Sequence, residues 1–350
     1  MGVNIILDYL VLSALMSLAV NYIIRDIAKK KNLLVDLPDK SRKFHKRATP
    51  LTGGIGILVA LLISGKLYID LNNLNGYIPE FTYYLVVGSI PLLLLFLIDD
   101  YRGLKVSQRL IIQTFSSLYI ILTTGIQIES FGNLLGFGGI NLGIFSIPAT
   151  IFCVVGLMNA FNMIDGINGL CSGCAIISLL LMGFYSGMIY DSMMILVIGS
   201  IIGFLIFNLR IFGKKRGVFL GDSGSNLIGF WVAWSAIYCS QNVLYEVEPI
   251  TMIWFVAIPF LDCIGLIFAR LKKGLNISSP GRDHIHHKLM NRFSSELTLV
   301  IILVISLITG FMGIFLNNLF QSWVSTYVFA FYASCYYLYA YYYTNRKLNV

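Results

Sequence analysis

Acidic, amide and histidine side chains gather in four short segments of this 350-residue chain. Carboxylates together with water bind hard cations such as Mg²⁺, and Arg, Lys and His neutralise phosphate oxygens. The segments therefore predict phosphoryl-transfer chemistry. They are Asp99-Asp100, Asn159 to Asp165, Gly221 to Ser225, and His284 to His287.

The acidic segments also have structural interpretations. The pair Asp99-Asp100 is typical of a solvated helix end, and Asp222, flanked by glycines, is typical of a helix N-cap. Adjacent carboxylates repel each other unless a cation lies close, and a free helix N-terminus attracts phosphate. Capping and cation binding are therefore compatible at these positions.

Amide and histidine side chains extend the pattern. Asn159, Asn162 and Asp165 recur every three residues, which places them on one flank of a helix. The histidine segment is flanked by Arg282 and Lys288, and we expect it to form a cationic pocket for phosphate. A zinc site is the weaker alternative, because neither cysteine nor the usual histidine spacing accompanies the segment.

The elements that carry these segments are predicted to be transmembrane helices. Hydrophobic residues make up 57% of the chain and charged residues 12%, against about 25% charged residues in soluble proteins. This composition excludes soluble, disordered, collagen-like and disulfide-scaffold classes. Because a span needs about 20 apolar residues, the sequence leaves room for one integral membrane domain over residues 1–350 and for no sizeable soluble domain.

Eleven apolar runs have spanning length, which predicts an all-α polytopic membrane protein of about 11 helices. Ten spans are the alternative, because the second run is short and rich in glycine and the fifth to seventh runs lie close together. The runs are 2–24, 51–66, 81–98, 106–124, 144–161, 168–188, 192–209, 223–240, 250–270, 298–316 and 323–343.

Positive charges orient the chain. Lys and Arg accumulate in cytoplasmic loops, and every Lys and Arg except Lys66 lies on one side of eleven alternating spans. That side holds all four polar segments, so we expect a cytosolic active site, an N-terminus outside and a C-terminus inside. The net charge of +8 is then a topology signal and needs no nucleic-acid partner. The cytosolic segments are 25–50, 99–109, 162–167, 210–222, 270–297 and 344–350.

The first apolar run and the cysteines complete this picture. The run is followed, not preceded, by its positive charges, so it is expected to stay as an anchoring helix instead of being cleaved as a signal peptide. Cys171 and Cys174 form a C-x-x-C without the context of a redox or metal motif, and we expect the cysteines to serve as small packing residues.

The ordered motifs resemble the polyprenyl-phosphate N-acetylhexosamine-1-phosphate transferase family, which includes the muramoyl-pentapeptide and dolichyl-phosphate enzymes. The resemblance runs from about residue 35 to 295. The form of the histidine motif and the segment Phe207 to Arg210 are closer to the bacterial GlcNAc-1-phosphate transferases that start O-antigen and related glycans. The matching motifs are Val35 to Pro38, Thr49 to Gly54, Asp99-Asp100, Asn159 to Leu170, Phe219 to Ser225 and His284 to His287.

The resemblance implies roles for individual residues. Asp222 matches the Mg²⁺ ligand, with Mn²⁺ as an alternative metal, and Asp99 and Asp100 match a pair that binds metal or deprotonates the lipid phosphate. Asp165 matches an essential acid near the nucleotide. The remaining matches are the catalytic histidines His284, His286 and His287 at the pyrophosphate, and the substrate-binding residues Lys46, Asn159, Asn162, Asn168, Asn208, Phe219 and Arg282.

Three positions depart from the family pattern. Gly103 stands where an acid or Lys is frequent, and Asn168 replaces the second Asp of an Asp-Gly-x-Asp-Gly motif. Leu51 replaces the Thr of the muramoyl branch, which argues against that branch's substrate.

The implied reaction transfers N-acetylhexosamine-1-phosphate, GlcNAc-1-phosphate in the first place, from a UDP-sugar to undecaprenyl or another polyprenyl phosphate and releases UMP. The expected location is the bacterial inner membrane, and a homodimer is a possible assembly. Another UDP-N-acetylhexosamine or UDP-MurNAc-pentapeptide is the alternative donor. A transporter or flippase of lipid-linked sugars and a non-catalytic scaffold are alternatives of other classes. The clusters lie at span ends on one face, whereas transporters bind their substrates near the midplane. Asp262 is the one candidate within a span, and an acid there is a functional suspect, but it lies toward the cytosolic end of its helix and could line the same site.

Overall fold

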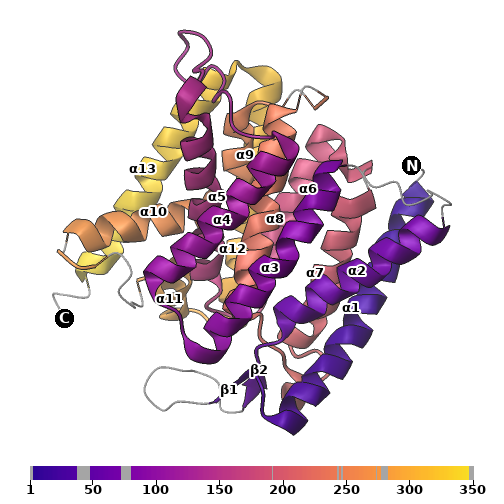
Figure 1. Cartoon of the computed structure of the whole chain (residues 1–350). Coiled ribbons are helices and arrows are strands. Elements are labelled where there is room, and N and C mark those ends of the chain that lie inside the picture. Colours follow the sequence, from indigo (N-terminus) through magenta and orange to yellow (C-terminus); the bar gives the residue numbers. More distant parts are fainter. Residues whose placement is uncertain are drawn as a thin grey trace. The chain divides into compact units, whose positions relative to one another are not determined.

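The computed structural model is almost entirely helical (Figure 1). It divides into two compact units: unit 1 is Met1–Gly125 with Met188–Trp231, and unit 2 is Ile126–Gly187 with Val232–Val350. The described part of the chain leaves out residues 1–2, 38–47, 72–79, 191, 243, 246, 273, 277–282 and 347–350, and the side chains of 3–5, 192 and 340–346.

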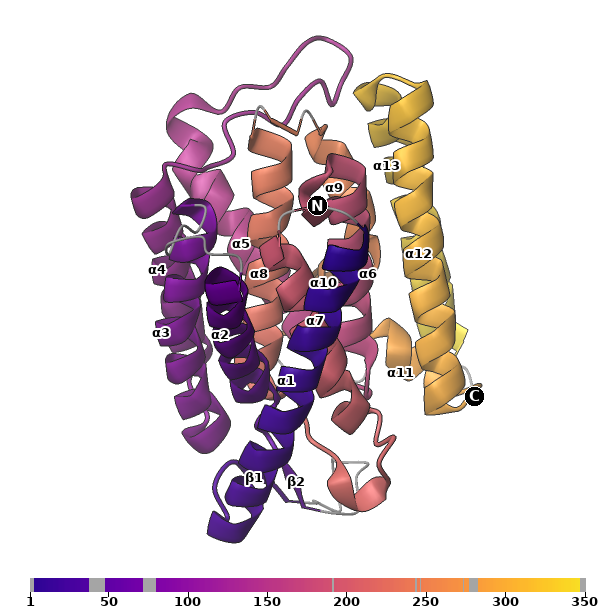
Figure 2. The same cartoon turned by 90° about the vertical axis from the view of Figure 1, so that its right-hand side faces the viewer.

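Unit 1 contains helices that pack along one another. α1 runs beside α7 and α2, and α3 packs against α4 (Figure 2). A short antiparallel pair, β1 and β2, lies between α1 and α2 in the chain. The bounds are α1 Val3–Lys31, β1 Val35–Asp36, β2 Thr49–Pro50, α2 Gly53–Leu71, α3 Glu80–Arg102, α4 Val106–Thr124, η2 Met188–Tyr190, α7 Ser192–Asn208, η3 Lys214–Arg216 and α8 Gly221–Gln241, which continues into unit 2.

Small residues bring α1 and α7 close together. The hydroxyls of Ser13 and Ser17 donate to the carbonyls of Leu196 and Ser200, each at 2.6 Å. A side chain at Gly203 would meet the α1 backbone. Where the surroundings are as apolar as the side chains, close backbone approach and polar contacts of this kind drive helix association.

Two sequence motifs interlock at the start of α8. The amide of Phe219 donates to the carbonyl of Pro50 at 2.8 Å, and the amide of Gly53 donates back to the carbonyl of Phe219 at 3.0 Å. The amide of Gly54 donates to the carbonyl of Leu220 at 3.3 Å. The segment Thr49 to Gly54 therefore supports the loop that leads into Asp222.

Unit 2 has its core around Trp254 of α9. Its indole ring packs edge-on against Phe329 at a centroid distance of 4.9 Å, and its N–H donates to the hydroxyl of Ser325 at 3.0 Å. α12 packs on α6 and α9, and α10 packs on α5. The bounds are η1 Gly143–Phe145, α5 Ser146–Ile164, α6 Leu170–Ser186, α9 Pro249–Phe255, α10 Ala257–Lys272, α11 Ile285–Met290, α12 Ser295–Leu319 and α13 Ser322–Arg346.

The ninth apolar run is broken, which corrects the prediction of one continuous helix over 250–270. α9 and α10 meet at an angle of 84°. Pro259 has no N–H, so the carbonyl of Phe255 lacks its helical partner. The hydroxyl of Ser178 donates to that carbonyl at 2.7 Å instead. This hydrogen bond gives the unpaired carbonyl at the break a partner within apolar surroundings.

The other ten apolar runs each coincide with one helix, which confirms the all-α prediction. Among the described residues, five helices are long and apolar enough to cross a membrane, or up to six if the bent pair α9–α10 is one span. These helices are α1, α2, α3, α5 (with η1) and α12. α6 and α7 are shorter apolar helices, and the predicted number of eleven or ten spans stays a prediction.

Gly54 provides a test of the interlocked motifs. A Cβ at Gly54 would lie 2.7 Å from backbone atoms of Gly224, whereas a Cβ at Gly65 of the same helix would meet nothing within 4 Å. We expect Gly54→Ala to destabilise the protein by about 1–3 kcal/mol, because backbone cannot yield as a side chain can. Thermal unfolding in detergent measures the effect. The control Gly65→Ala should unfold at or slightly above the wild-type temperature, and equal behaviour of the two variants would contradict the interlock.

Candidate active site

Asp99 stabilises the turn between α3 and α4. Its carboxylate accepts the amide of Leu104 at 2.7 Å and binds Arg109 through both oxygens, with Nε–Oδ2 at 2.7 Å and Nη2–Oδ1 at 3.0 Å. The turn passes through Gly103 at φ +70°, a conformation that glycine adopts without strain. This explains why a glycine suits the place where the family often has an acid or Lys.

Asp100 holds the N-terminus of α8. Its Oδ1 accepts the amide of Asp222 at 2.7 Å and its Oδ2 accepts the amide of Ser223 at 3.1 Å. The first amides of a helix have no partner within the helix, and a carboxylate is stabilised there by the helix dipole. Gly221 has φ +76°, and a Cβ on it would approach Oδ2 of Asp100 to 2.7 Å. Asp100 therefore accepts the first amides of α8, and Asp222 lies in its first turn.

Asp222 is far more accessible than Asp99. It lies in the first turn of α8, and its side chain is 36% exposed, against 0% for Asp99. Nη2 of Arg109 lies 3.2 Å from its Oδ2, so one guanidinium balances both carboxylates. Sequence reasoning missed Arg109, because we counted it only as a topology charge. Its position one helical turn into α4, beside an acidic helix end, was the available signal.

These donors fit a divalent cation. Asp222 carries hard carboxylate oxygens of the kind that Mg²⁺ prefers, and Asp99 lies beside it with both oxygens bound to Arg109. The partial exposure of Asp222 leaves oxygen surface for a metal and its waters. Both oxygens of Asp100 already accept backbone amides, so Asp100 orients Asp222 in this geometry.

Asn208 is the last residue of α7, and Phe219 lies in the loop between α7 and α8. The side-chain amide of Asn208, 5% exposed, donates to the carbonyl of Val218 at 3.0 Å. Arg210, at φ +61°, places its guanidinium carbon 5.8 Å from the Phe219 ring centroid. The two predicted substrate-binding residues therefore lie at the end of α7 and in the loop that follows it, and Arg210 of this loop places a cation beside Phe219.

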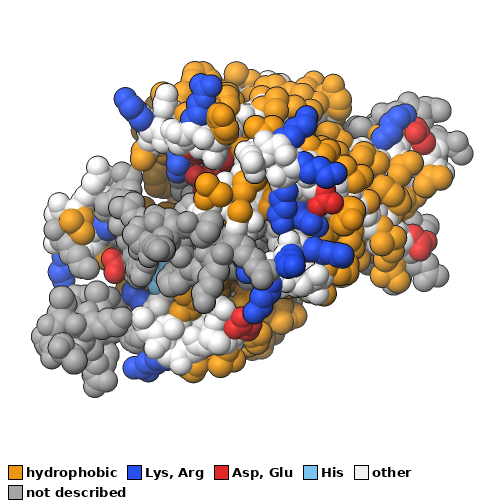
Figure 3. Space-filling model, turned by 90° about the horizontal axis from the view of Figure 1, so that it is seen from below, with side chains coloured by type: hydrophobic (Ala, Val, Ile, Leu, Met, Phe, Trp, Pro, Cys, Tyr) orange, Lys and Arg blue, Asp and Glu red, His pale blue; other side chains and the backbone are white. Residues whose placement is uncertain are grey.

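The end of α1 contacts the basic turn η3 within unit 1. Figure 3 shows clusters of Lys and Arg on the face seen from below. Nζ of Lys29, at the end of α1, donates to the carbonyl of Lys215 in η3 at 2.7 Å. Three segments predicted to share one side of the membrane thus contact one another in unit 1 through described residues: Lys29 with Lys215, Pro50 with Phe219, and Asp100 with Asp222.

In unit 2, the polar flank of α5 ends at Asp165. The helix continues to Ile164, and Asp165 terminates it at φ −73° and ψ 49°. The side chain of Asn159 donates to the carbonyl of Val155 at 2.7 Å. Asn159, Asn162 and Asp165 are partly buried, and Asn168 follows in the turn before α6.

His286 packs against the turn that follows Asp165. It is 1% exposed, and a Cβ on Gly166 would overlap its ring. Burial, helped by the neighbouring histidines, lowers the pKa of His286 to about 3, so the ring is neutral at neutral pH. Both ring nitrogens are buried without a hydrogen-bond partner among the described residues. The Asp-Gly and histidine motifs, far apart in sequence, thus meet in unit 2.

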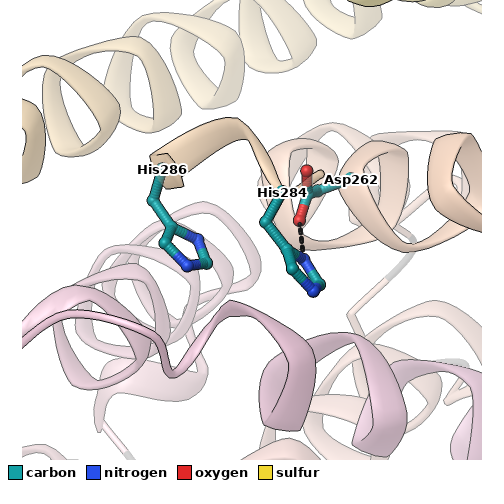
Figure 4. A group of neighbouring side chains, drawn as sticks. All are labelled: Asp262, His284 and His286. Atoms are coloured by element: carbon teal, nitrogen blue, oxygen red, sulfur yellow. Dashed lines mark hydrogen bonds and ion pairs between the residues drawn. The ribbon is translucent and has the colours of Figure 1, made fainter. Parts of the chain in front are cut away.

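His284 is held by an acid that the sequence placed within a span. Nδ1 of His284 lies 2.8 Å from Oδ2 of Asp262 (Figure 4). Ligand atoms of Asp262, His284 and His286 lie within 4.8 Å of one another, a grouping that could hold a metal ion. The ring of His287 lies 4.2 Å from that of His286, centroid to centroid.

The predicted site residues thus form two groups. Unit 1 brings together Asp99, Asp100 and Asp222, with Asn208 at the end of α7 and Phe219 in the loop before α8. Unit 2 brings the Asp165 turn to the histidines. The meeting of Asp165 with Asp222 stays a prediction, and Lys46 and Arg282 lie outside the described residues.

A substitution at Gly166 tests the contact between the two motifs of unit 2. We expect Gly166→Ala to lower the unfolding temperature, because the new methyl group overlaps the His286 ring. Combining it with His286→Ala should recover part of that loss, a non-additive result typical of contacting residues. Gly156→Ala in α5 is the control, since a Cβ there meets nothing within 4 Å. Equal unfolding temperatures for Gly166→Ala and Gly156→Ala would contradict the contact.

Comparison with known proteins agrees with these motifs. Residues 82–240 match the family model Glycosyl transferase family 4. The chain is 33% identical over 309 residues to the undecaprenyl-phosphate alpha-N-acetylglucosaminyl 1-phosphate transferase of Yersinia pestis, covering 86% of this chain and 81% of the relative. Proteins of the same name from Escherichia coli K12 (32%, covering 83% and 78%) and Haemophilus influenzae (31%, covering 80% and 79%) are also similar. The chain therefore belongs to glycosyl transferase family 4, on the branch of these undecaprenyl-phosphate sugar-1-phosphate transferases.

Proposed function

We propose that this protein transfers N-acetylglucosamine-1-phosphate from UDP-N-acetylglucosamine to undecaprenyl phosphate and releases UMP. The observation that carries the proposal is the 33% identity over 86% of the chain to an enzyme named for transfer to undecaprenyl phosphate. The acidic cluster at the start of α8 supports it, because phosphoryl transfer uses carboxylates that hold a divalent cation beside the phosphates.

The lipid phosphate needs little activation. A phosphate monoester has its second pKa near 6, so the attacking oxygen is mostly ionised at neutral pH. An oxygen of the lipid phosphate attacks the β-phosphorus of the donor, the bond from that phosphorus to the bridging oxygen breaks, and UMP leaves with the bond electrons. Because the nucleophile is already an anion, the residues act mainly by positioning and by balancing charge.

Asp222 would hold Mg²⁺, with Asp99 near it and Asp100 fixing the helix end. When bound, the ion would offset the charge that builds up on the diphosphate. Arg109 contacts Asp99 and Asp222. When substrate binds, Arg109 would either leave Asp222 or share its carboxylate with the metal ion. Asp100 acts through the backbone of α8 and needs no contact with substrate.

The other predicted residues complete the proposed binding of the donor. Lys46, Asn208 and Phe219 would hold the uridine diphosphate, with support from the loop that Asn208 closes. Asn159, Asn162, Asn168 and Arg282 would bind the sugar and phosphates, and Asp165 with the histidines would lie at the nucleotide and pyrophosphate. We place the reaction at the cytosolic face of a bacterial inner membrane, at the start of a surface glycan such as O-antigen.

A transporter of lipid-linked sugars is the second candidate. The 84° break between α9 and α10, with the buried acid Asp262 just beyond it, favours this class, since broken helices and buried acids line transporter sites. The two candidates differ in whether a covalent product forms.

Labelled product formation tests the function. Purified protein with undecaprenyl phosphate, Mg²⁺ and a panel of radiolabelled UDP-sugars should form a butanol-extractable lipid and equimolar UMP, with UDP-N-acetylglucosamine as the preferred donor. Preference for UDP-N-acetylgalactosamine or UDP-MurNAc-pentapeptide would keep the reaction and change the substrate. Sugar movement across vesicles without UMP release would support the transporter.

Asp222→Ala tests the role of the acidic cluster. We expect less than about a hundredth of wild-type turnover, because removing a charge-stabilising group costs about 10²–10³ in rate. Asp70→Asn is the matched control, an exposed acid of α2 paired with Lys66 at 2.9 Å, and it should keep wild-type turnover. Near-normal turnover of a folded Asp222→Ala protein would remove the proposed metal role.

A further inference from the structure

Asp262 is a buried acid to which the proposed reaction assigns no role. It is 4% exposed and lies in α10, shortly after the break at Phe255. A buried carboxylate is costly unless it is paired and hydrogen-bonded. Its partners therefore indicate why this position is acidic.

Three donors surround the Asp262 carboxylate. Oδ2 lies 2.8 Å from Nδ1 of His284, and Oδ1 accepts the amide of Ile285 at 2.8 Å and the hydroxyl of Tyr336 at 3.3 Å. His284 is the N-cap residue of α11, but its own side chain makes no cap hydrogen bond. Asp262 thus accepts the first amide of α11. The same carboxylate also holds the His284 ring (Figure 4).

These hydrogen bonds determine which nitrogen of His284 is available. An ionised carboxylate only accepts hydrogen bonds, so Nδ1 carries a proton and Nε2 is left for another partner. A metal ion would need oxygen or nitrogen lone pairs from these groups. Asp262 already directs both oxygens to N–H and O–H donors, so the geometry favours an orienting carboxylate over a metal ligand.

We propose that Asp262 is a positioning residue that presents Nε2 of His284 to a phosphate oxygen of the sugar nucleotide. The inference rests on the proposed function. To donate to an anionic oxygen, Nε2 must carry a proton as well, and the Asp262 carboxylate balances the resulting charge within the pair. His286 has both ring nitrogens buried and is neutral at neutral pH, so it cannot supply that charge. Asp262 itself touches no substrate.

Two substitutions at His284 test which nitrogen acts. The side-chain amide of Gln reaches the place of Nε2, and that of Asn reaches the place of Nδ1. We expect His284→Gln to keep a KM for the UDP-sugar at least about tenfold lower than His284→Asn, the usual effect of a hydrogen bond to a charged group. A lower KM for His284→Asn would overturn the proposal. So would stoichiometric zinc in the wild-type protein that His284→Gln removes.

A double-mutant cycle then tests Asp262 itself. In wild-type background, Asp262→Asn should raise the KM for the UDP-sugar by about tenfold with a smaller change in kcat. In the His284→Gln background it should leave KM unchanged, because the donor no longer depends on the carboxylate. Tyr336→Phe, which removes only the 3.3 Å hydrogen bond to Oδ1, is the control and should keep the wild-type KM.

The outcomes separate the two proposals. A wild-type protein that forms no labelled lipid with any UDP-sugar overturns the proposed function. An active wild type in which Asp262→Asn changes KM and unfolding temperature equally in both backgrounds overturns the positioning role alone, because that result is expected of a purely structural cap of α11.

Discussion

The contact between Asp100 and the first amides of α8 is the interaction on which the acidic site depends. The position of Asp222 is fixed by Asp100, because Asp222 lies in the first turn of a helix whose first amides bind that carboxylate of α3. The adjacent Asp99 turns the chain into α4 and brings Arg109 back to both acids. The two neighbouring carboxylates therefore have different roles. Asp100 accepts hydrogen bonds from a helix N-terminus, and Asp99 forms an ion pair with a guanidinium.

Glycines make this arrangement sterically feasible. Gly221 adopts a positive φ beside Asp100, and Gly54 lies against the backbone of Gly224. In unit 2, Gly166 leaves room for the ring of His286. Each of these glycines belongs to a motif recognised in the sequence, but its function is to let another motif approach. The residues of these motifs are thus explained by the contacts between motifs as much as by the chemistry of the reactive side chains.

Much of the fold could be predicted from the sequence. Apolar runs predicted the helices, and the run 106–124 has the same bounds as α4. The break after Phe255 was missed because a hydropathy window does not register that Pro259 removes one amide and that Ser178 compensates for it. The six-residue helix α11 was missed because it is too short to show a period.

The sequence predicted which residues belong to the candidate site better than it predicted the contacts among them. Grouping acids by type and charge identified Asp99, Asp100 and Asp222, yet it could not show which acid is exposed and which holds a helix end. The role of Arg109 was missed because it depends on a long-range contact that joins α4 to α8. Asp262 was singled out as an acid within a span, but its partner His284, 22 positions away in the chain, could not be predicted. Such pairings depend on packing between helices, which no local pattern contains.

The central claim is that the start of α8 presents Asp222 to a divalent cation. It is tested most directly by the affinity of purified protein for Mn²⁺ in the presence of UDP, measured from the electron paramagnetic resonance signal of free Mn²⁺. The account predicts that Asp222→Asn weakens Mn²⁺ binding by about tenfold or more, as for the loss of one charged ligand. Asp222→Asn protein that binds Mn²⁺ as tightly as wild type would contradict it.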